Sequence, residues 1–208
     1  MRKLWSYSTT VRNPERIRDF LRILKEMEGL EWTRPNQKKF QVLLIKNRLY
    51  GYGNTQFYNS LPKKYVDLID SDKEISLKIA EQILDSKNYT GGGDMRGRQS
   101  FNPIEKMGLA YLTKDNKIKI SSFGEYFLKE DYDLGEIFFK SFIKWQLPNF
   151  DSTDYKESDG YNIKPFIATL HLINEVNKLY GKSKNKEVGI SRTEFSIFVP
   201  TLVSHKQI

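Results

Sequence analysis

Hydrophobic residues recur at helical spacing in several segments, and capping residues mark where these segments begin. Asn13 and Pro14 are typical of a helix start, because Asn caps the first turn and Pro fits the first helical position. The positions that follow place five apolar side chains on one helical face: Ile17, Phe20, Leu21, Leu24 and Met27. The same spacing predicts further helices over residues 36–50, 73–86, 134–147 and 163–180. Ser191 and Glu194 match a capping box that begins another helix.

A different pattern, helix, strand, turn, strand and helix, occupies residues 100–128. A short helix fits residues 100–107, and strands fit residues 109–112 and 118–120, with a polar turn between them. Ser121 and Ser122 then cap another helix. With the helix over 73–86 as the preceding element, this order is that of a winged helix. We therefore predict a mainly α fold with a winged-helix DNA-binding domain.

The pattern also predicts how the chain divides into domains. Residues 1–133 are expected to form an N-terminal arm, extended over residues 4–10, followed by the winged-helix domain, in which residues 87–98 are a flexible glycine-rich loop. Residues 134–208 are expected to form a helical subdomain. Its inward side chains are predicted to be Ile137, Phe138, Phe142, Trp145, Ile167, Leu170, Ile173 and Tyr180. Because the last helices lack a partner for their apolar face, we expect the truncated start of a second winged-helix unit.

Composition narrows the class of protein. The 208 residues include no cysteine and only two histidines, which excludes disulfides and argues against a zinc site. No apolar run reaches the length of a membrane span, and the start of the chain has no apolar signal region. We expect a cytoplasmic protein that does not bind membranes.

The net charge of +8 is concentrated in two segments. Residues 1–25 carry seven basic and two acidic side chains, and residues 96–119 carry six basic and two acidic side chains. Such clustering favours contact with a polyanion, although solvated surface charge is an alternative interpretation.

Candidate DNA contacts lie on the short helix, on the wing and in the N-terminal arm. In the major groove, Arg suits guanine, and Asn or Gln suits adenine, whereas lysines on a wing suit phosphates. The candidates on the helix and its approach are Arg96, Arg98, Gln99, Ser100, Asn102 and Lys106; those on the wing are Lys114, Lys117 and Lys119; those in the arm are Thr9, Thr10 and Arg12.

The sequence offers no convincing catalytic or metal-binding residues. A metal-dependent nuclease needs clustered carboxylates, commonly in the pattern Pro-Asp followed by Asp/Glu-x-Lys, and no proline here precedes an aspartate. An alternative is a complete small Mg²⁺-dependent nuclease that uses Asp131, Asp133, Asp154 and Lys156. The polar residues 149–162 argue against the buried strands that such a site requires.

Several segments resemble the AlwI family of type IIS restriction endonucleases: residues 5–17, 40–50, 103–109, 118–124, 144–150 and 189–191. The resemblance implies sequence-specific recognition of double-stranded DNA by this N-terminal part. In the family, a PD-(D/E)xK domain then cuts, or nicks, to one side of the site using Mg²⁺. We expect no cofactor and no catalytic domain in this chain, which leaves its own enzymatic activity open and suggests a catalytic domain or subunit in trans. A regulatory, partner-binding winged-helix protein is a further alternative.

Overall fold

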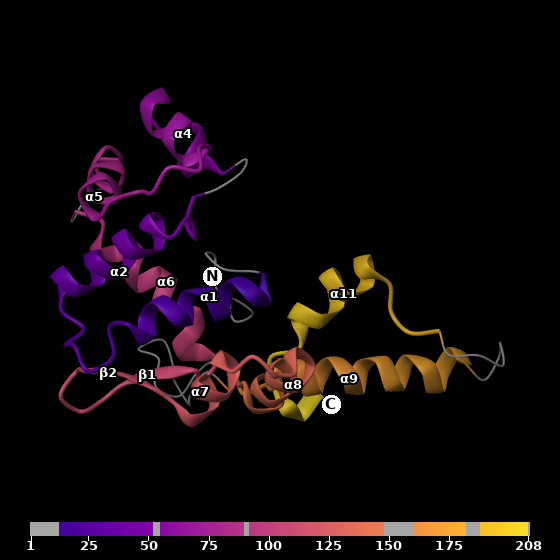
Figure 1. The fold of residues 1–208 in the computed structure, drawn as a ribbon. Helices are drawn as coiled ribbons and strands as arrows, with labels where there is room; N and C mark the ends of the chain where they lie inside the picture. Colours follow the sequence, from indigo (N-terminus) through magenta and orange to yellow (C-terminus); the bar gives the residue numbers. More distant parts are fainter. Residues whose placement is uncertain (1–12, 52–54, 90–91, 148–159, 182–187, 208) are drawn as a thin grey trace. The chain divides into compact units, whose positions relative to one another are not determined.

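The computed structural model describes residues 13–51, 55–89, 92–147, 160–181 and 188–207. The described residues form two compact units, which we call the N-terminal unit (residues 13–134) and the C-terminal unit (residues 135–207). The fold is mainly helical, as predicted. The N-terminal unit contains, in order, α1 (Pro14–Lys25), α2 (Arg34–Lys46), α3 (Gln56–Asn59), α4 (Lys63–Ile69), α5 (Leu77–Asp85), α6 (Asp94–Lys106), β1 (Ala110–Leu112), β2 (Ile118–Ile120) and α7 (Ser122–Leu128) (Figure 1).

The start and the buried face of α1 are those predicted from the sequence. The Asn13 side chain accepts a hydrogen bond of 3.0 Å from the backbone N–H of Glu15. All five apolar residues predicted to share one face are buried: Ile17, Phe20, Leu21, Leu24 and Met27. Burial of such a stripe stabilises the helix by removing apolar surface from water.

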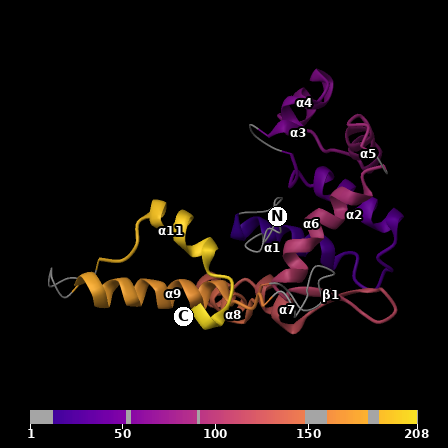
Figure 2. The ribbon, with the colours of Figure 1, turned by 180° about the vertical axis from the view of Figure 1, so that it is seen from behind.

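Helix α2 is buried on more than one side. It packs against α1 and α6, and α5 packs on it as well (Figure 2). Val42 and Ile45 join side chains of the following segment in one apolar cluster: Phe57, Leu61, Ile69, Ile75, Ala80, Ile83 and Leu84. Helices α3 to α5 therefore build their core upon α2.

The contact between α2 and α6 requires a glycine. A Cβ atom added at Gly97 would lie 1.9 Å from the backbone oxygen of Gln37, far inside van der Waals contact. The backbones of the two helices can approach this closely only because Gly97 has no side chain.

Helix α5 is the helix that precedes α6 in the chain, as predicted for residues 73–86, but it is not the helix on which α6 packs most extensively. The extensive contacts of α6 are with α2 and α1. Helices α3 and α4, which the periodicity did not predict, lie with α5 between α2 and α6 in the sequence.

The predicted hairpin is present and is joined by a third segment. β1 and β2 pair antiparallel, with Tyr111 opposite Lys119. The chain after α1 then pairs with β2 at the other edge. The N–H of Gly29 donates to Ile118 O at 2.9 Å, and the N–H of Ile118 donates to Leu30 O at 2.9 Å. The hairpin is thereby fixed to the end of α1.

Helix α7 follows the hairpin directly. The hydroxyl of Ser121 accepts a hydrogen bond of 2.9 Å from the N–H of Gly124, which confirms the predicted cap. Phe127 is fully buried.

The C-terminal unit contains α8 (Leu134–Lys144), α9 (Pro165–Val176), the π-helix η2 (Asn177–Gly181), α11 (Arg192–Phe198), η3 (Val199–Thr201) and η4 (His205–Gln207). The predicted capping box is present, because Ser191 N–H donates to Glu194 at 2.7 Å and Glu194 N–H donates to the Ser191 hydroxyl at 3.2 Å. Ile137 is buried as predicted. Leu170 and Tyr180, however, are exposed, so their assignment to a packed side is wrong.

Candidate nucleic-acid interface

Helix α6 begins earlier than the sequence pattern predicted. Gly93 precedes it with a φ of 87°, a conformation that favours glycine, and the helix starts at Asp94. The prediction of a flexible loop over residues 87–98 is therefore wrong for residues 94–98. Arg96 and Arg98 lie on the first turns of a helix instead.

The exposed side of α6 borders a hollow of about 410 Å³. Three predicted DNA contacts line it, namely Arg98, Gln99 and Asn102. Trp32 and Leu112 bring in the segment after α1 and the strand β1. The hollow thus lies where α6 meets the hairpin, and it combines apolar walls with polar side chains.

Arg98 and Asn102 are the most accessible of the predicted residues on α6, because both are exposed. Arg96 and Gln99 are half-buried and bonded to each other, with Arg96 Nη1 donating to Gln99 Oε1 at 3.0 Å. The Arg96 guanidinium also lies 4.5 Å from the ring centre of Tyr89. Arg98 and Asn102 therefore present the polar groups that can most readily meet a partner.

Two predicted contacts on α6 are less accessible than Arg98 and Asn102. Ser100 is fully buried, and its hydroxyl donates to Gln41 Oε1 at 2.9 Å. This side chain belongs to the contact between α2 and α6, so its assignment to DNA is corrected. Lys106 is half-buried, and desolvation lowers the pKa of its ammonium group.

The hairpin presents two of its three predicted lysines freely at its end. Lys114 and Lys117 are exposed and flank a tight turn in which Asn116 has a φ of 55°. The backbone N–H of Thr113 donates to Lys117 O at 2.9 Å and closes that turn. Two cations are thus held beside α6 on a short, well-bonded loop.

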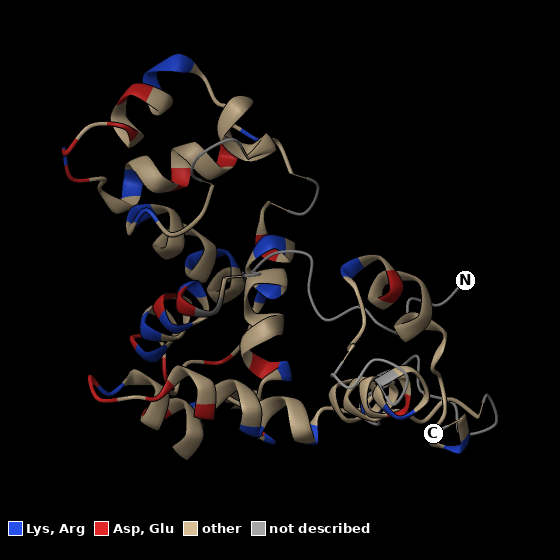
Figure 3. Ribbon diagram, turned by 90° about the vertical axis from the view of Figure 1, so that its right-hand side faces the viewer, with Lys and Arg blue, Asp and Glu red and all other residues tan. Residues whose placement is uncertain are grey.

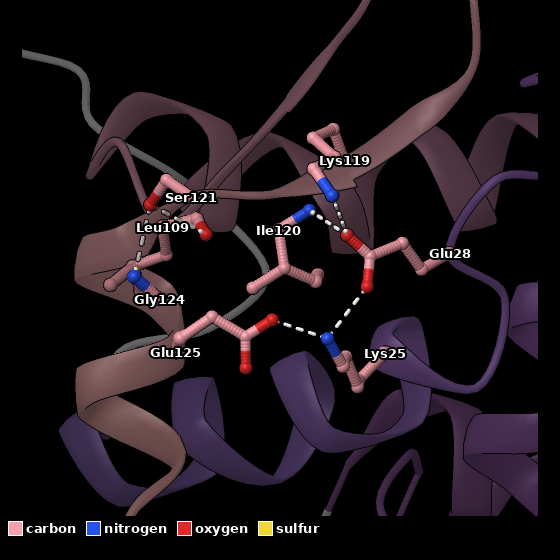
Figure 4. A network of polar contacts seen from close by, with 8 residues as sticks. All are labelled: Lys25, Glu28, Leu109, Lys119, Ile120, Ser121, Gly124 and Glu125. Atoms are coloured by element: carbon pink, nitrogen blue, oxygen red, sulfur yellow. Dashed lines mark hydrogen bonds and ion pairs between the residues drawn. The ribbon is translucent and has the colours of Figure 1, made fainter.

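Lys119, the third lysine, has an acidic partner inside the N-terminal unit (Figure 4). Its Nζ lies 3.1 Å from Glu28 Oε1, which also accepts a hydrogen bond of 3.1 Å from the N–H of Ile120. Lys25 contacts Glu28 Oε2 at 2.6 Å and bonds to Glu125 as well. The hydrogen bond from Lys25 is the main cause that lowers the pKa of Glu28 from 4.5 to about 2, and the bonds from Ile120 and Lys119 add to it against the opposing effect of burial.

The Arg18 side chain forms hydrogen bonds within the N-terminal unit, so its guanidinium group is not directed at a partner. Its Nε donates to Phe127 O at 2.8 Å and its Nη2 donates to Lys129 O at 2.6 Å, so it satisfies carbonyl groups at the end of α7. Its guanidinium also lies 4.4 Å from the ring centre of Tyr132.

The other described basic residues of the first segment also have partners within the N-terminal unit. Arg16 donates to Leu49 O, and Arg22 forms an ion pair of 3.1 Å with Asp19. The expectation that residues 1–25 face a polyanion is thus corrected for Arg16 and Arg18, whose guanidinium groups bond to backbone carbonyls, whereas Arg22 and Lys25 are exposed and form surface ion pairs. Thr9, Thr10 and Arg12 lie outside the described residues. Both basic and acidic residues are distributed over the helices, among many uncharged positions (Figure 3).

Sequence reasoning did not assign to the site five residues that line the hollow: Trp32, Met95, Phe101, Glu105 and Leu112. Met95 fell in the predicted loop, and Trp32 followed the end of a helix, so neither had a helical pattern to place it. Glu105 was counted only as an acid within a basic segment. Its spacing of seven from Arg98 and three from Asn102 is the signal that places it on the same face.

The alternative nuclease residues are only partly described. Asp131 and Asp133 are exposed, whereas Asp154 and Lys156 lie outside the described residues. Within the described ranges, no group of three or more His, Cys, Asp or Glu side chains could hold a metal ion. Those same ranges contain no helix with the length and apolar character needed to cross a membrane.

The match to a known family begins at the end of α6. A family model described as AlwI restriction endonuclease matches residues 105–208, which is half of the chain. The matched residues include the last two residues of α6, the hairpin, α7 and the C-terminal unit. No curated protein matches the chain.

Proposed function

Because the chain belongs to the AlwI restriction endonuclease family, whose substrate is DNA, we propose that its N-terminal unit recognises a specific sequence in double-stranded DNA. The recognition helix is α6. An α-helix with its side chains is about 10–12 Å wide and fits a major groove that is about 12 Å wide. The observation that carries this proposal is the exposure of Arg98 and Asn102 beside a hairpin that ends in Lys114 and Lys117.

The order of elements supports a winged-helix arrangement. We assign its three helices to α1, α2 and α6, and its wing to β1 and β2. The paired segment at Gly29–Leu30 joins this wing to α1, as a first short strand does in that fold. Helices α3 to α5 are then an insertion between the second helix and the reading helix.

The exposed side chains divide by chemistry into two groups. Arg98 can form two hydrogen bonds with the O6 and N7 atoms of one guanine, and Asn102 can form two with the N6 and N7 atoms of one adenine. Both side chains can therefore recognise base edges. Lys114 and Lys117 supply point charges on the hairpin and suit phosphates, which carry no sequence information. Recognition thus combines base contacts from α6 with positioning by the wing.

Two substitutions test this division, with binding to a pool of random duplexes measured at a stated salt concentration. We expect Arg98→Ala to lower the specificity ratio, which is the affinity for the preferred sequence divided by that for other sequences. The corresponding free-energy difference should fall by roughly 1–3 kcal/mol, because one base contact is lost. We expect Lys117→Ala to weaken binding to all sequences by a similar factor.

Lys78→Ala is the matched control, because Lys78 is an exposed cation on α5 rather than on the reading surface. It should leave the specificity ratio unchanged. If Arg98→Ala also left that ratio unchanged, α6 would not be the reading helix.

We assign no cleavage step to the described residues. They do not fit the Mg²⁺ that the family resemblance implies, because they gather no metal-binding group. We propose that cutting of the DNA depends on a Mg²⁺-dependent catalytic part distinct from α6 and the hairpin, in the same polypeptide or in a partner subunit.

A partner-binding role is the second candidate. The C-terminal unit exposes several large apolar side chains, including Leu179, Tyr180, Ile197 and Phe198. Exposed apolar side chains of this size can contribute to an interaction surface. A chain that shows no preference among random duplexes would favour this role over sequence recognition.

A further inference from the structure

Glu105 is an acidic side chain on the face that we assign to DNA. It lines the same hollow as Arg98 and Asn102, together with Trp32 and Leu112. It is exposed, so its carboxylate can meet a partner that approaches α6. Phosphates repel a carboxylate, so a contact between Glu105 and DNA would have to be to a base rather than to the backbone.

The spacing along α6 places the three polar groups in a row. Asn102 follows Arg98 by four residues, and Glu105 follows Asn102 by three, so all three lie on one helical face. At 1.5 Å per residue, the row extends about 10 Å along the helix axis. That length corresponds to roughly three base-pair steps of 3.4 Å, so the side chains can address different base pairs.

We propose that Glu105 selects cytosine at one position of the recognised sequence. A carboxylate only accepts hydrogen bonds, and in the major groove cytosine presents the N4 amino group as a donor. Guanine and thymine present acceptors there, and adenine presents the acceptor N7 beside its amino group. Trp32 and Leu112 line the same hollow as Glu105 and give it an apolar surface beside the carboxylate. The inference rests on the proposed function, because it requires α6 in the major groove.

The test is Glu105→Gln in the full 208-residue chain, with selection from random duplexes. Gln keeps the size of the side chain but adds donors, and it suits adenine N6 and N7. We expect the preferred base at one position to change from cytosine to adenine, with cytosine preference there falling by about 5- to 150-fold. Glu105→Ala should flatten preference at that position and raise affinity for non-specific DNA, because one repulsive charge is removed.

Glu81→Gln is the control, because it removes an exposed acid from α5 without touching the hollow. It should leave all base preferences intact. Helix content measured by circular dichroism should be the same in all variants.

Two outcomes separate the failure of this inference from that of the proposed function. If the wild-type chain selects a sequence but Glu105→Gln selects the same bases at every position, the role of Glu105 is overturned while recognition by α6 stands. If the wild-type chain selects no sequence at all, the proposed function fails, and this role of Glu105 fails with it.

Discussion

At the scale of single residues, Glu28 joins segments that are far apart in the sequence. It follows α1, and its carboxylate binds Lys25 on α1, Lys119 on β2 and the backbone of Ile120. Only about a fifth of its side chain is exposed, at 20%. The group therefore holds the hairpin to the end of α1 through hydrogen bonds that are partly shielded from water.

We expect Glu28→Gln to lower the free energy of unfolding at pH 7 by about 2 kcal/mol, measured by urea denaturation. The pKa of Glu28 in the folded protein, about 2, lies below the ordinary value of 4.5. Its charge therefore stabilises the fold above pH 4.5, and this contribution is lost as the pH falls from 4.5 towards 2. The difference between wild type and variant should shrink over the same interval.

Glu26→Gln provides the comparison, because Glu26 is an exposed acid at the end of the same helix. Its effect should stay within about 0.5 kcal/mol at every pH. A stability loss in Glu28→Gln that remained undiminished at pH 2.5 would contradict the assigned role.

At the scale of elements, the placement of α6 depends on its contact with α2. Gly97 allows the close approach, and the buried pair Ser100 and Gln41 adds a hydrogen bond across it. Because the exposed side of α6 carries Arg98 and Asn102, the packed side fixes the direction in which these residues point. Recognition chemistry and helix packing are thus coupled within a single element.

We expect Gly97→Ala to destabilise the N-terminal unit by about 2–3 kcal/mol, because the added methyl group would overlap the Gln37 carbonyl and force the helices apart. Thermal unfolding followed by circular dichroism measures the change. Asn102→Ala on the exposed face of the same helix should shift stability by less than about 0.5 kcal/mol. Equal stability of Gly97→Ala and wild type would mean that the two backbones are not in contact.

Elements with strong local signals could be predicted from the sequence. Asn13 and Ser191 marked helix starts, and the short polar turn before Lys117 marked the hairpin, because capping and turn formation involve neighbours in the chain. The buried face of α1 followed from spacing alone. Of the candidate site, Asn102 was correctly placed on a helix, whereas Arg98 fell in the segment that was predicted to be a loop.

Features that depend on tertiary contacts could not be predicted. The first turns of α6 contain Gly97, and a glycine in a polar segment indicates a loop when the sequence is considered alone. Its role becomes clear only from the close contact between α6 and α2. Arg18 binds carbonyl groups more than a hundred residues away, so its basic charge looked available for DNA. For Leu170, spacing indicated a helix face but not whether anything covers that face.

At the scale of the whole molecule, the net charge of +8 overstates the charge available to DNA from the described residues. Four described cations of the first basic segment contact groups within the N-terminal unit. In the second segment, Lys119 pairs with Glu28, while Arg98, Lys114 and Lys117 remain exposed. Basic side chains therefore serve both the fold and the proposed interface.

We expect a modest dependence of DNA binding on salt. The logarithm of the association constant should fall against the logarithm of salt concentration with a slope of roughly −2 to −4, because few phosphates are contacted. Titrations at four or more salt concentrations give this slope. Lys114→Ala and Lys117→Ala should each reduce its magnitude by about 1, whereas Arg22→Ala should not change it.

A slope that is insensitive to both wing substitutions would place the phosphate contacts elsewhere. A slope that changes with Arg22→Ala instead would show that α1 contacts DNA phosphates.

The insertion of α3 to α5 also bears on how the N-terminal unit assembles. To pack α6 against α2, the chain must bring together two helices separated by residues 47–93, and closing a flexible loop of that length costs about 3 kcal/mol. The intervening segment builds its apolar cluster directly on Val42 and Ile45 of α2. Packing of that segment on α2 also brings the start of α6 close to α2, which shortens the length of free chain that must be closed when the two helices pack. The contact between α2 and α6, which is distant in sequence, is thereby supported by contacts between α2 and the segment that follows it.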